Sequence, residues 1–255
     1  MRSGKGFKIG AISFLVVIFL FSSLVTSSPG SNIAFATTEE AIGPAVSPAR
    51  RAHWVCDPYE KLNRKVFKFN DVVYLRVLKP VSKAYSTVVP CRVRKSIDSG
   101  FHNLAFPSRF INSALQGKLG QAGTEMARFI VNSSIGIGGL FDVAEAKFDL
   151  SGHEADFGQT LGLWGAGPGP FLMIPILGAS DVRDLVGLGP DKVMDPLIWI
   201  PAGQLVRFAV SAERGLNGIP SGLAHYEESK SASLDPYVAM RDGYMQHRAH
   251  LIERQ

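Results

Sequence analysis

The sequence predicts a mainly helical fold that contains one short apolar hairpin rich in glycine and proline. Two segments, 57–60 and 234–237, carry the Asp-Pro signature of a helix start, and apolar residues at helical spacing follow each of them. A third segment, 157–180, contains no Asp, Glu, Lys, Arg or His but has six glycines and three prolines. Because these residues break a membrane-spanning helix, the segment predicts a hairpin rather than a span.

The first 36 residues have the pattern of an export signal. Arg2, Lys5 and Lys8 precede the apolar stretch 9–25, and Ala34-Phe35-Ala36 offers the small residues that a signal peptidase reads. An uncleaved anchor is the alternative, because the stretch is close to spanning length. We expect a signal peptide at 1–36, a flexible Ala-, Pro- and Ser-rich linker at 37–56, and a folded domain at 57–255.

Most of the formal net charge of +5 comes from this signal. Removing it leaves 24 Lys and Arg against 22 Asp and Glu, a net charge of +2. The basic cluster at Arg92, Arg94 and Lys95 is expected on a solvated helix surface. The sequence therefore predicts no nucleic acid partner.

Cys56 and Cys91 are the two cysteines of the chain, and both fall in the exported part. A pair of cysteines in an oxidising compartment predicts a disulfide, which would contribute about 3 to 4 kcal/mol in the loop-entropy model. Two buried free thiols are the alternative. Cys56 is a poor lipid acceptor, because His53-Trp54-Val55 lacks the small residues expected before a lipidated cysteine.

The first helix is expected to begin at Asp57-Pro58-Tyr59-Glu60, with Asp57 as N-cap and Glu60 completing a capping box. One apolar face of this helix is predicted to be buried. It consists of Leu62, Val66, Phe69, Val73 and Val77.

Further helices follow from the same spacing. They are predicted around Val93, Ile97, Phe101 and Leu104, over the short segment 109–112 after Pro107, over 122–132 with Met126, Phe129 and Ile130, and after Asp235-Pro236 with Tyr237, Met240, Tyr244, His247 and Leu251.

The glycines of segment 135–142 interrupt this helical pattern without forming a nucleotide-binding motif. Neither G-x-G-x-x-G, G-x-x-x-x-G-K-[ST] nor G-x-S-x-G occurs in the chain. Histidines near other ligands, such as His153 and the pair His247 and His250, lack a convincing third ligand. We therefore predict no catalytic residue, no cofactor and no metal.

The hairpin is predicted to have arms at 161–166 and 171–176 around the turn Gly167-Pro168-Gly169-Pro170. The alternative is an ordinary core hairpin of an enzyme. A second apolar patch at 196–201 contains Trp199, a residue suited to a membrane interface.

Several long motifs, in order along the chain, resemble the MlaA/VacJ family of outer-membrane lipoproteins. The similarity covers most of residues 57–252. Its motifs are Asp57-Pro58-Tyr59-Glu60-Lys61-Leu62-Asn63-Arg64, Phe67-Lys68-Phe69-Asn70, Arg128-Phe129 to Asn132, Gly136-Ile137-Gly138-Gly139-Leu140-Phe141-Asp142-Val143-Ala144, Asp156-Phe157-Gly158-Gln159-Thr160-Leu161-Gly162, Trp164-Gly165, Gly169-Pro170, Pro175, Arg183-Asp184, Asp235-Pro236-Tyr237 and Arg241.

This resemblance implies a ring-like bundle of amphipathic helices within the inner leaflet of the Gram-negative outer membrane, enclosing a polar channel. It implies removal of mislocalised phospholipid from the outer leaflet and delivery to a periplasmic lipid carrier, beside a trimeric porin and without enzyme chemistry. It places Phe67, Phe69 and Asn70 in a helix region that influences gating, although core packing is the alternative for the two phenylalanines.

The candidate lipid path includes residues in and near the hairpin. They are Trp164, Gly165, Gly169, Pro170, Leu172 and Ile174. Lys147, Arg183 and Asp184 are unranked candidates to meet a headgroup.

Two features depart from the family pattern: no cysteine follows the apolar stretch directly, and Cys56 and Cys91 offer an extra bridge. We therefore expect a protein held at the periplasmic face of the outer membrane by its own apolar surface. A soluble periplasmic lipid-binding or scaffold protein is one alternative, and a periplasmic hydrolase is another that the missing motifs disfavour.

Overall fold

The computed structural model describes residues 55–199, 201 and 203–253. The predicted signal peptide at 1–36 and all but the last two residues of the predicted linker at 37–56 lie outside the described residues. The described elements are helical except for one pair of strands. In chain order they are α2 (Glu60–Val73), the π-helix η2 (Tyr74–Leu78), α3 (Lys79–Val88), α4 (Cys91–Leu104), α5 (Phe106–Leu115), α6 (Leu119–Ser134), α7 (Val143–Phe148), α8 (Phe157–Leu163), β1 (Phe171–Ile174), β2 (Gly178–Asp181), α9 (Val182–Met194), the 3₁₀-helix η3 (Pro196–Ile198), α10 (Gln204–Ala232) and α11 (Pro236–Glu253).

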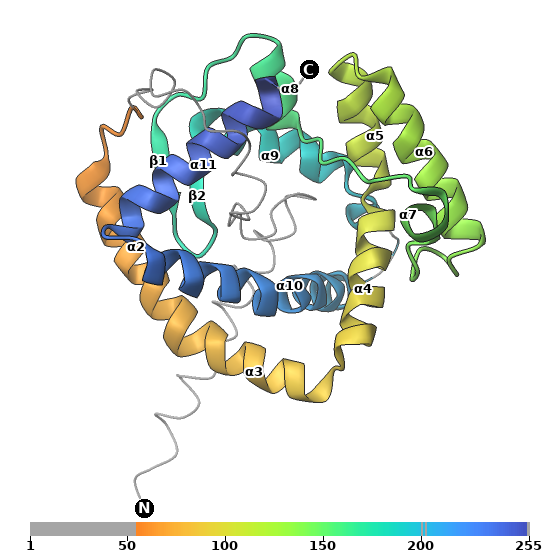
Figure 1. The fold of residues 1–255 in the computed structure, drawn as a ribbon, viewed down its shortest axis with the longest axis horizontal. Coiled ribbons are helices and arrows are strands. Elements are labelled where there is room, and N and C mark those ends of the chain that lie inside the picture. The colour runs from red at the N-terminus through yellow and green to blue at the C-terminus, as the bar shows by residue number, and fades with distance from the viewer. Residues whose placement is uncertain (1–54, 200, 202, 254–255) are drawn as a thin grey trace, which may run out of the picture.

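The elements from α2 to the hairpin follow one another round a ring, and α9, α10 and α11 pack along elements of this ring (Figure 1). α4 packs on α5 and α6, α5 packs on α8 and α9, and α8 packs on α11. β2 packs on α11 and β1 packs on α2, so the hairpin joins the last part of the ring to the first. α10 contacts α3, α4 and α11. The predicted mainly helical, ring-like fold is confirmed.

α2, η2 and α3 form one continuous helical segment over residues 60–88. The residues at both joins, Val73 and Leu78, have right-handed helical backbone angles. Pro80 has no backbone N–H, so it cannot donate the usual helical hydrogen bond to the Arg76 carbonyl. In a regular α-helix its ring would also clash with that carbonyl. The wider π-turn at residues 74–78 accommodates this proline within an unbroken helix.

The predicted start of the first helix is wrong, whereas the matching start near the C-terminus is confirmed. α2 begins at Glu60 after Tyr59, without a side-chain cap. The Asp57 carboxylate instead accepts hydrogen bonds from Asn63, at 2.8 Å, and from the Tyr237 hydroxyl. Asp235 does cap α11, by accepting from the backbone N–H groups of Tyr237 and Val238 at 3.1 and 3.3 Å.

The predicted buried face of the first helix is also wrong. Leu62, Phe69 and Val77 are exposed, whereas Asn63 and Asn70 are each only 2% exposed. The helices predicted around 93–104, 109–112, 122–132 and 237–251 all exist. On α6, however, the buried face again contains polar residues, and Met126 and Ile130 are exposed.

The hairpin exists and its first strand lies within the predicted second arm, but the predicted first arm and turn are wrong. Residues 157–163 form α8 because the Asp156 carboxylate caps that helix through the N–H of Gln159, at 2.7 Å. β1 pairs antiparallel with β2, with Phe171 opposite Asp181 and Ile174 opposite Gly178. The chain turns at 175–177, where Ile176 has φ 70° and the following Gly178 has φ 91°. Gly167-Pro168-Gly169-Pro170 is the connection between α8 and β1.

The predicted bridge between Cys56 and Cys91 is contradicted, because both thiols are free and exposed. Cys56 precedes the continuous helical segment 60–88, and Cys91 follows it. A helix of that length extends for roughly 40 Å at about 1.5 Å per residue. A disulfide requires Cα atoms within about 7 Å of one another, so the helix itself separates the two cysteines.

Aromatic residues form two neighbouring clusters where α2, α10, α11 and the hairpin meet. Phe171 and Met173 of β1 pack with Tyr237 and Tyr244 of α11. Phe67 of α2 packs against this cluster and also against a second cluster, which consists of Tyr74, Leu223 and Tyr226. No helix among the described residues is both long enough and apolar enough to cross a bilayer.

Candidate functional site

The described part of the chain buries more polar than apolar side chains. Eighteen polar or charged side chains are buried, against 14 hydrophobic ones, while 25 large hydrophobic side chains are exposed. Soluble proteins usually bury their large apolar residues and almost never fully bury unpaired charges. The helices of the ring are therefore held together largely by hydrogen bonds and ion pairs, and many large apolar side chains remain at the protein surface.

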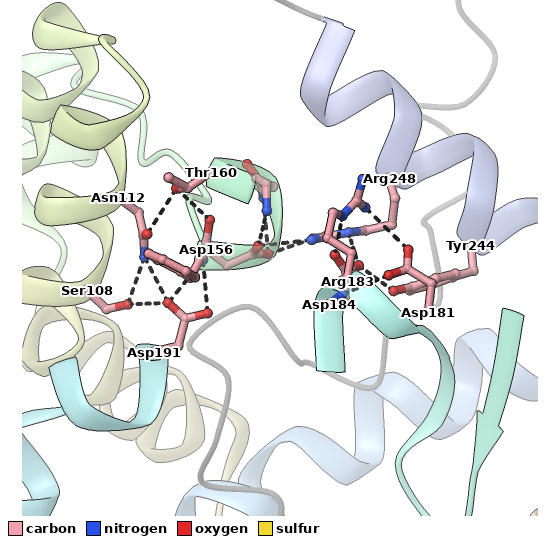
Figure 2. A network of polar contacts seen from close by, with 12 residues as sticks. Ser108, Asn112, Asp156, Thr160, Asp181, Arg183, Asp184, Asp191, Tyr244 and Arg248 are labelled. Atoms are coloured by element: carbon pink, nitrogen blue, oxygen red, sulfur yellow. Dashed lines mark hydrogen bonds and ion pairs between the residues drawn. The ribbon is translucent and has the colours of Figure 1, made fainter. Parts of the chain in front are cut away.

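Figure 2 shows a polar network that connects α5, α8, α9 and α11. Arg248 of α11 donates from both terminal nitrogens to Asp156, at 2.6 and 2.9 Å. Its Nε lies 2.5 Å from Oδ2 of Asp184, and that same oxygen accepts from the Tyr244 hydroxyl. One arginine thus links the N-terminal ends of α8 and α9 to the last described helix.

The pKa values of this network follow from burial and pairing. Burial alone would raise the pKa of Asp156, but the charge and hydrogen bonds of Arg248 outweigh it, so the pKa is lowered. Burial and the neighbouring Asp184 raise the pKa of Asp181 to about 6. Asp181 is fully buried, caps α9 through the N–H of Asp184, and accepts from Arg183 at 3.3 Å.

Asp191 extends the network to α5 without an ion pair among the described residues. Its carboxylate accepts from the Asn112 amide at 2.8 Å, the Ser108 hydroxyl at 3.2 Å and the Phe157 N–H at 3.0 and 3.1 Å. Burial and the nearby Asp156 raise the pKa of Asp191 to about 6. Asn112 also accepts from Thr160 of α8, at 3.0 Å, so a polar contact holds these two helices together.

A second polar network lies between α5, α6 and the segment around α7. Arg109 pairs with Glu125 at 2.7 Å, and both side chains are almost fully buried. Arg128 pairs with Asp142 at 2.6 Å. Asn132 donates to the same aspartate at 2.9 Å and accepts from the Ala144 N–H. These contacts fix the glycine-rich segment 135–142 against α6.

His102 provides a pH test of this second network. Burial, with the positive charges of Arg109 and Arg128, lowers the pKa of His102 to about 4. A folded-state pKa below the ordinary value means that stability is present above about pH 6.5 and is lost as the pH falls towards 4. Between about pH 7 and pH 4.5, the free energy of unfolding of His102→Gln should fall by about 2 to 3 kcal/mol less than that of the parent. Urea unfolding at the two pH values measures this difference. Equal losses in the variant and the parent would contradict a neutral, partly buried His102.

α2 and the first residue of η2 hold the hairpin through three side chains, Asn63, Asn70 and Tyr74, which we call the hairpin clamp. Asn63 donates to the Phe171 carbonyl at 3.1 Å and accepts from the Met173 N–H at 3.0 Å. Asn70 makes a similar pair of hydrogen bonds at the turn. Its side chain donates to the Ile174 carbonyl at 2.9 Å and accepts from the Ile176 N–H at 2.7 Å.

The Tyr74 hydroxyl completes the clamp by donating to the Ile176 carbonyl at 2.6 Å. Asn63, Asn70 and Tyr74 share one helix face because they are separated by seven and four residues. Asn63 satisfies backbone groups of β1, and Asn70 and Tyr74 satisfy backbone groups at the end of β1 and in the turn that follows it. The position of the hairpin therefore depends directly on α2.

The structure brings some of the predicted site residues together and separates others. Asn70 contacts the hairpin, where Leu172 and Ile174 are half-buried on the face opposite Phe171 and Met173. Phe67 lies edge-on to Tyr237, with ring centroids 5.9 Å apart. Phe69 is instead half exposed on the outer side of α2.

Trp164, Gly165, Gly169 and Pro170 lie in the connection before β1 rather than in the hairpin. The Trp164 ring N–H donates to the Leu115 carbonyl at 3.3 Å, and the ring is largely exposed. Gly165 and Gly169 have positive φ angles of 94° and 71°, which favour glycine. The Cβ of any other residue at position 169 would lie 3.3 Å from Val182.

Sequence reasoning missed Asn63 as a site residue, and it missed the partnership of Asp156, Asp184 and Arg248. A signal for Asn63 was available: Asn63 and Asn70 recur at a seven-residue spacing on one helix. The described residues contain no group of three or more His, Cys, Asp or Glu side chains placed to hold a metal ion.

Comparisons with known proteins add independent information. The family model "MlaA lipoprotein" matches residues 55–251. An uncharacterised protein of Rickettsia bellii is 34% identical over 200 residues, which are 78% of each chain. A protein of Escherichia coli strain K12, called "Intermembrane phospholipid transport system lipoprotein MlaA", is 32% identical over 74% of this chain and 76% of its own length.

A Haemophilus influenzae protein of the same name is 31% identical over 195 residues, with 74% and 76% of the two chains covered. A solved structure called "Structural basis for maintenance of bacterial outer membrane lipid asymmetry" contains a chain that is similar in fold, with a TM-score of 0.67. That chain is 32% identical, and the match covers 77% of this chain and 99% of the solved one.

Proposed function

The chain belongs to the MlaA lipoprotein family, and from this we propose that it serves in the outer membrane as a component of an intermembrane phospholipid transport system that maintains lipid asymmetry. It removes mislocalised phospholipid from the outer leaflet. Transport requires no bond to be made or broken in the lipid, so the protein acts as a transport component and not as an enzyme.

The observation that carries this function is the distribution of polarity in the ring. A phospholipid has a charged headgroup and two apolar tails, and a protein that moves it must offer polar groups to the head while its outer surface remains stable in lipid. The described residues expose 25 large hydrophobic side chains, which suits a surface in lipid, and their 18 buried polar or charged side chains hold the helices together in place of an apolar core. A soluble scaffold protein has no need for this arrangement.

We also propose two protein partners, a periplasmic lipid carrier and a trimeric porin. The extracted lipid must cross an aqueous compartment, so a periplasmic lipid carrier receives it. A trimeric porin lies beside the ring in the membrane. We further propose that residues 1–36 are a cleaved signal and that the exposed apolar surface holds the protein at the periplasmic face.

The hairpin and α2 are the proposed gate of the lipid path. Phe67, Asn70, Leu172 and Ile174 lie where α2 meets β1, and the clamp makes the hairpin position depend on α2. Trp164, Gly165, Gly169 and Pro170 shape the connection that leads into the hairpin. A small movement of α2 would therefore move the hairpin as well.

A charge added to the half-buried face of the hairpin tests this proposal. We expect Leu172→Glu or Ile174→Glu to leave the ring folded but to reduce transport several-fold, because a carboxylate on this face disfavours contact with acyl chains. The measurement is complementation of a deletion strain, read as the amount of phospholipid in the outer leaflet. Ser151→Glu, at an exposed loop position, adds the same charge and should complement fully. Full complementation by both hairpin variants would contradict this assignment.

A further inference from the structure

The positive charge of the folded domain is concentrated in one helical segment. Residues 60–88 contain seven Lys and Arg and two Asp and Glu. The rest of residues 55–253 contains 14 Lys and Arg and 18 Asp and Glu. Many of those other arginines, such as Arg109, Arg128 and Arg248, are buried in ion pairs. The accessible positive charge is therefore not spread evenly round the ring.

Three of these lysines form a row on the outer side of α2, which we call the lysine face: Lys61, Lys65 and Lys68. Their spacing of four and three residues places them on one side of the helix. The hairpin clamp residues Asn63 and Asn70 lie on the opposite, buried side. All three lysines are exposed, and among the described residues none of them forms an ion pair.

The two acidic residues of segment 60–88 are engaged elsewhere. Glu60 pairs with Arg64 at 2.7 Å. Asp71 accepts from the Tyr226 hydroxyl at 2.7 Å and pairs with Lys230 of α10 at 2.5 Å. Neither carboxylate neutralises the lysine face, so the face presents an uncompensated positive charge.

Exposed apolar residues are interleaved with these lysines. Leu62, Phe69 and Val72 are 59%, 50% and 49% exposed on the same helix. This mixture is typical of a helix that lies in a membrane interface, where apolar side chains enter the acyl region and lysine stems extend their ammonium groups to the headgroups. An acidic protein surface would match the charge but would not need the apolar residues.

We propose that the lysine face binds anionic phospholipid headgroups, so that α2 docks on an anionic lipid surface. This inference rests on the proposed function and adds a lipid class to it. Because α2 also carries the hairpin clamp, anionic lipid is recruited next to the proposed gate. Each ammonium group contributes attraction that falls with increasing ionic strength.

The test is flotation of the purified mature protein, without residues 1–36, with vesicles of phosphatidylcholine alone and with vesicles that also contain phosphatidylglycerol. The triple variant Lys61→Gln, Lys65→Gln, Lys68→Gln should lose affinity for the anionic vesicles by about 10- to 100-fold and retain binding to phosphatidylcholine. Arginine at the same three positions should restore the preference. The control Lys83→Gln, Arg92→Gln, Lys95→Gln removes the same charge from exposed positions outside α2 and should behave like the parent.

The possible results distinguish a failure of anionic lipid binding by the lysine face from a failure of the proposed function. Equal losses in the α2 triple and the control triple would overturn the lysine face, and so would a parent chain without preference for phosphatidylglycerol. Loss of carrier protein binding with unchanged vesicle binding would assign the face to an acidic protein instead. If the parent binds neither kind of vesicle, the membrane location itself is contradicted. Equal thermal unfolding of all the variants would show that the fold is intact.

Discussion

Replacing Arg248 by Met is expected to destabilise the folded ring by about 3 to 5 kcal/mol or to prevent folding, because two buried carboxylates lose their shared cation. Arg248 contacts Asp156 through two hydrogen bonds and Asp184 through Nε. Methionine fills a similar volume but leaves both charges uncompensated. The free energy of unfolding, from urea titration in detergent followed by far-UV circular dichroism, measures the effect.

Two further variants show whether the stability loss comes from the ion pairs of Arg248 or from removing any arginine. Arg248→Lys keeps the charge but cannot form the bidentate contact, so it should fall between the parent and Arg248→Met. Arg92→Met removes an exposed arginine and should change stability by no more than about 0.5 kcal/mol. A stability loss below about 1 kcal/mol in Arg248→Met would mean that this ion-pair network does not hold α8, α9 and α11 together.

The double variant Asn63→Leu, Asn70→Leu is expected to release the hairpin from α2. It removes four hydrogen bonds to the hairpin backbone, and buried groups left without partners cost about 1 to 3 kcal/mol each. Leucine has a similar size, so the change tests hydrogen bonding rather than volume. Hydrogen exchange should become faster at the backbone amides of Met173 and Ile176, because in the parent these N–H groups donate to the side chains of Asn63 and Asn70.

Val72→Leu is the matched control, because it changes an exposed residue of the same helix that lies away from the hairpin. It should leave exchange at both amides unchanged. If the double asparagine variant also exchanged like the parent, the hairpin would be held by β-pairing and aromatic packing alone. Altered lipid transport in the double variant would further connect the clamp to the proposed gate.

Sequence reasoning predicted the helices well where the signal was local. Asp235 caps α11 as expected, since the Asp-Pro signature depends on neighbouring residues alone. The same signature failed at Asp57, because its carboxylate is taken by Asn63 and by Tyr237 from the other end of the chain. Tertiary contacts of that kind have no local pattern.

Which helix faces are buried could not be predicted from apolar spacing. That rule assumes that apolar side chains face the interior, and in α2 the interior side carries Asn63 and Asn70 while Leu62 and Phe69 face outward. The hairpin was misplaced for a related reason. Gly167-Pro168-Gly169-Pro170 has strong turn residues, but the Asp156 cap makes a helix of the first predicted arm, and the Asn70 contacts fix the turn at 175–177.

The proposed function is tested most directly by mass spectrometry of the lipids that co-purify with the mature protein from detergent-extracted outer membrane, compared with the soluble periplasmic fraction. The account predicts that the protein is found in the membrane fraction with bound phospholipid. Lipid-free protein in the soluble fraction would contradict it.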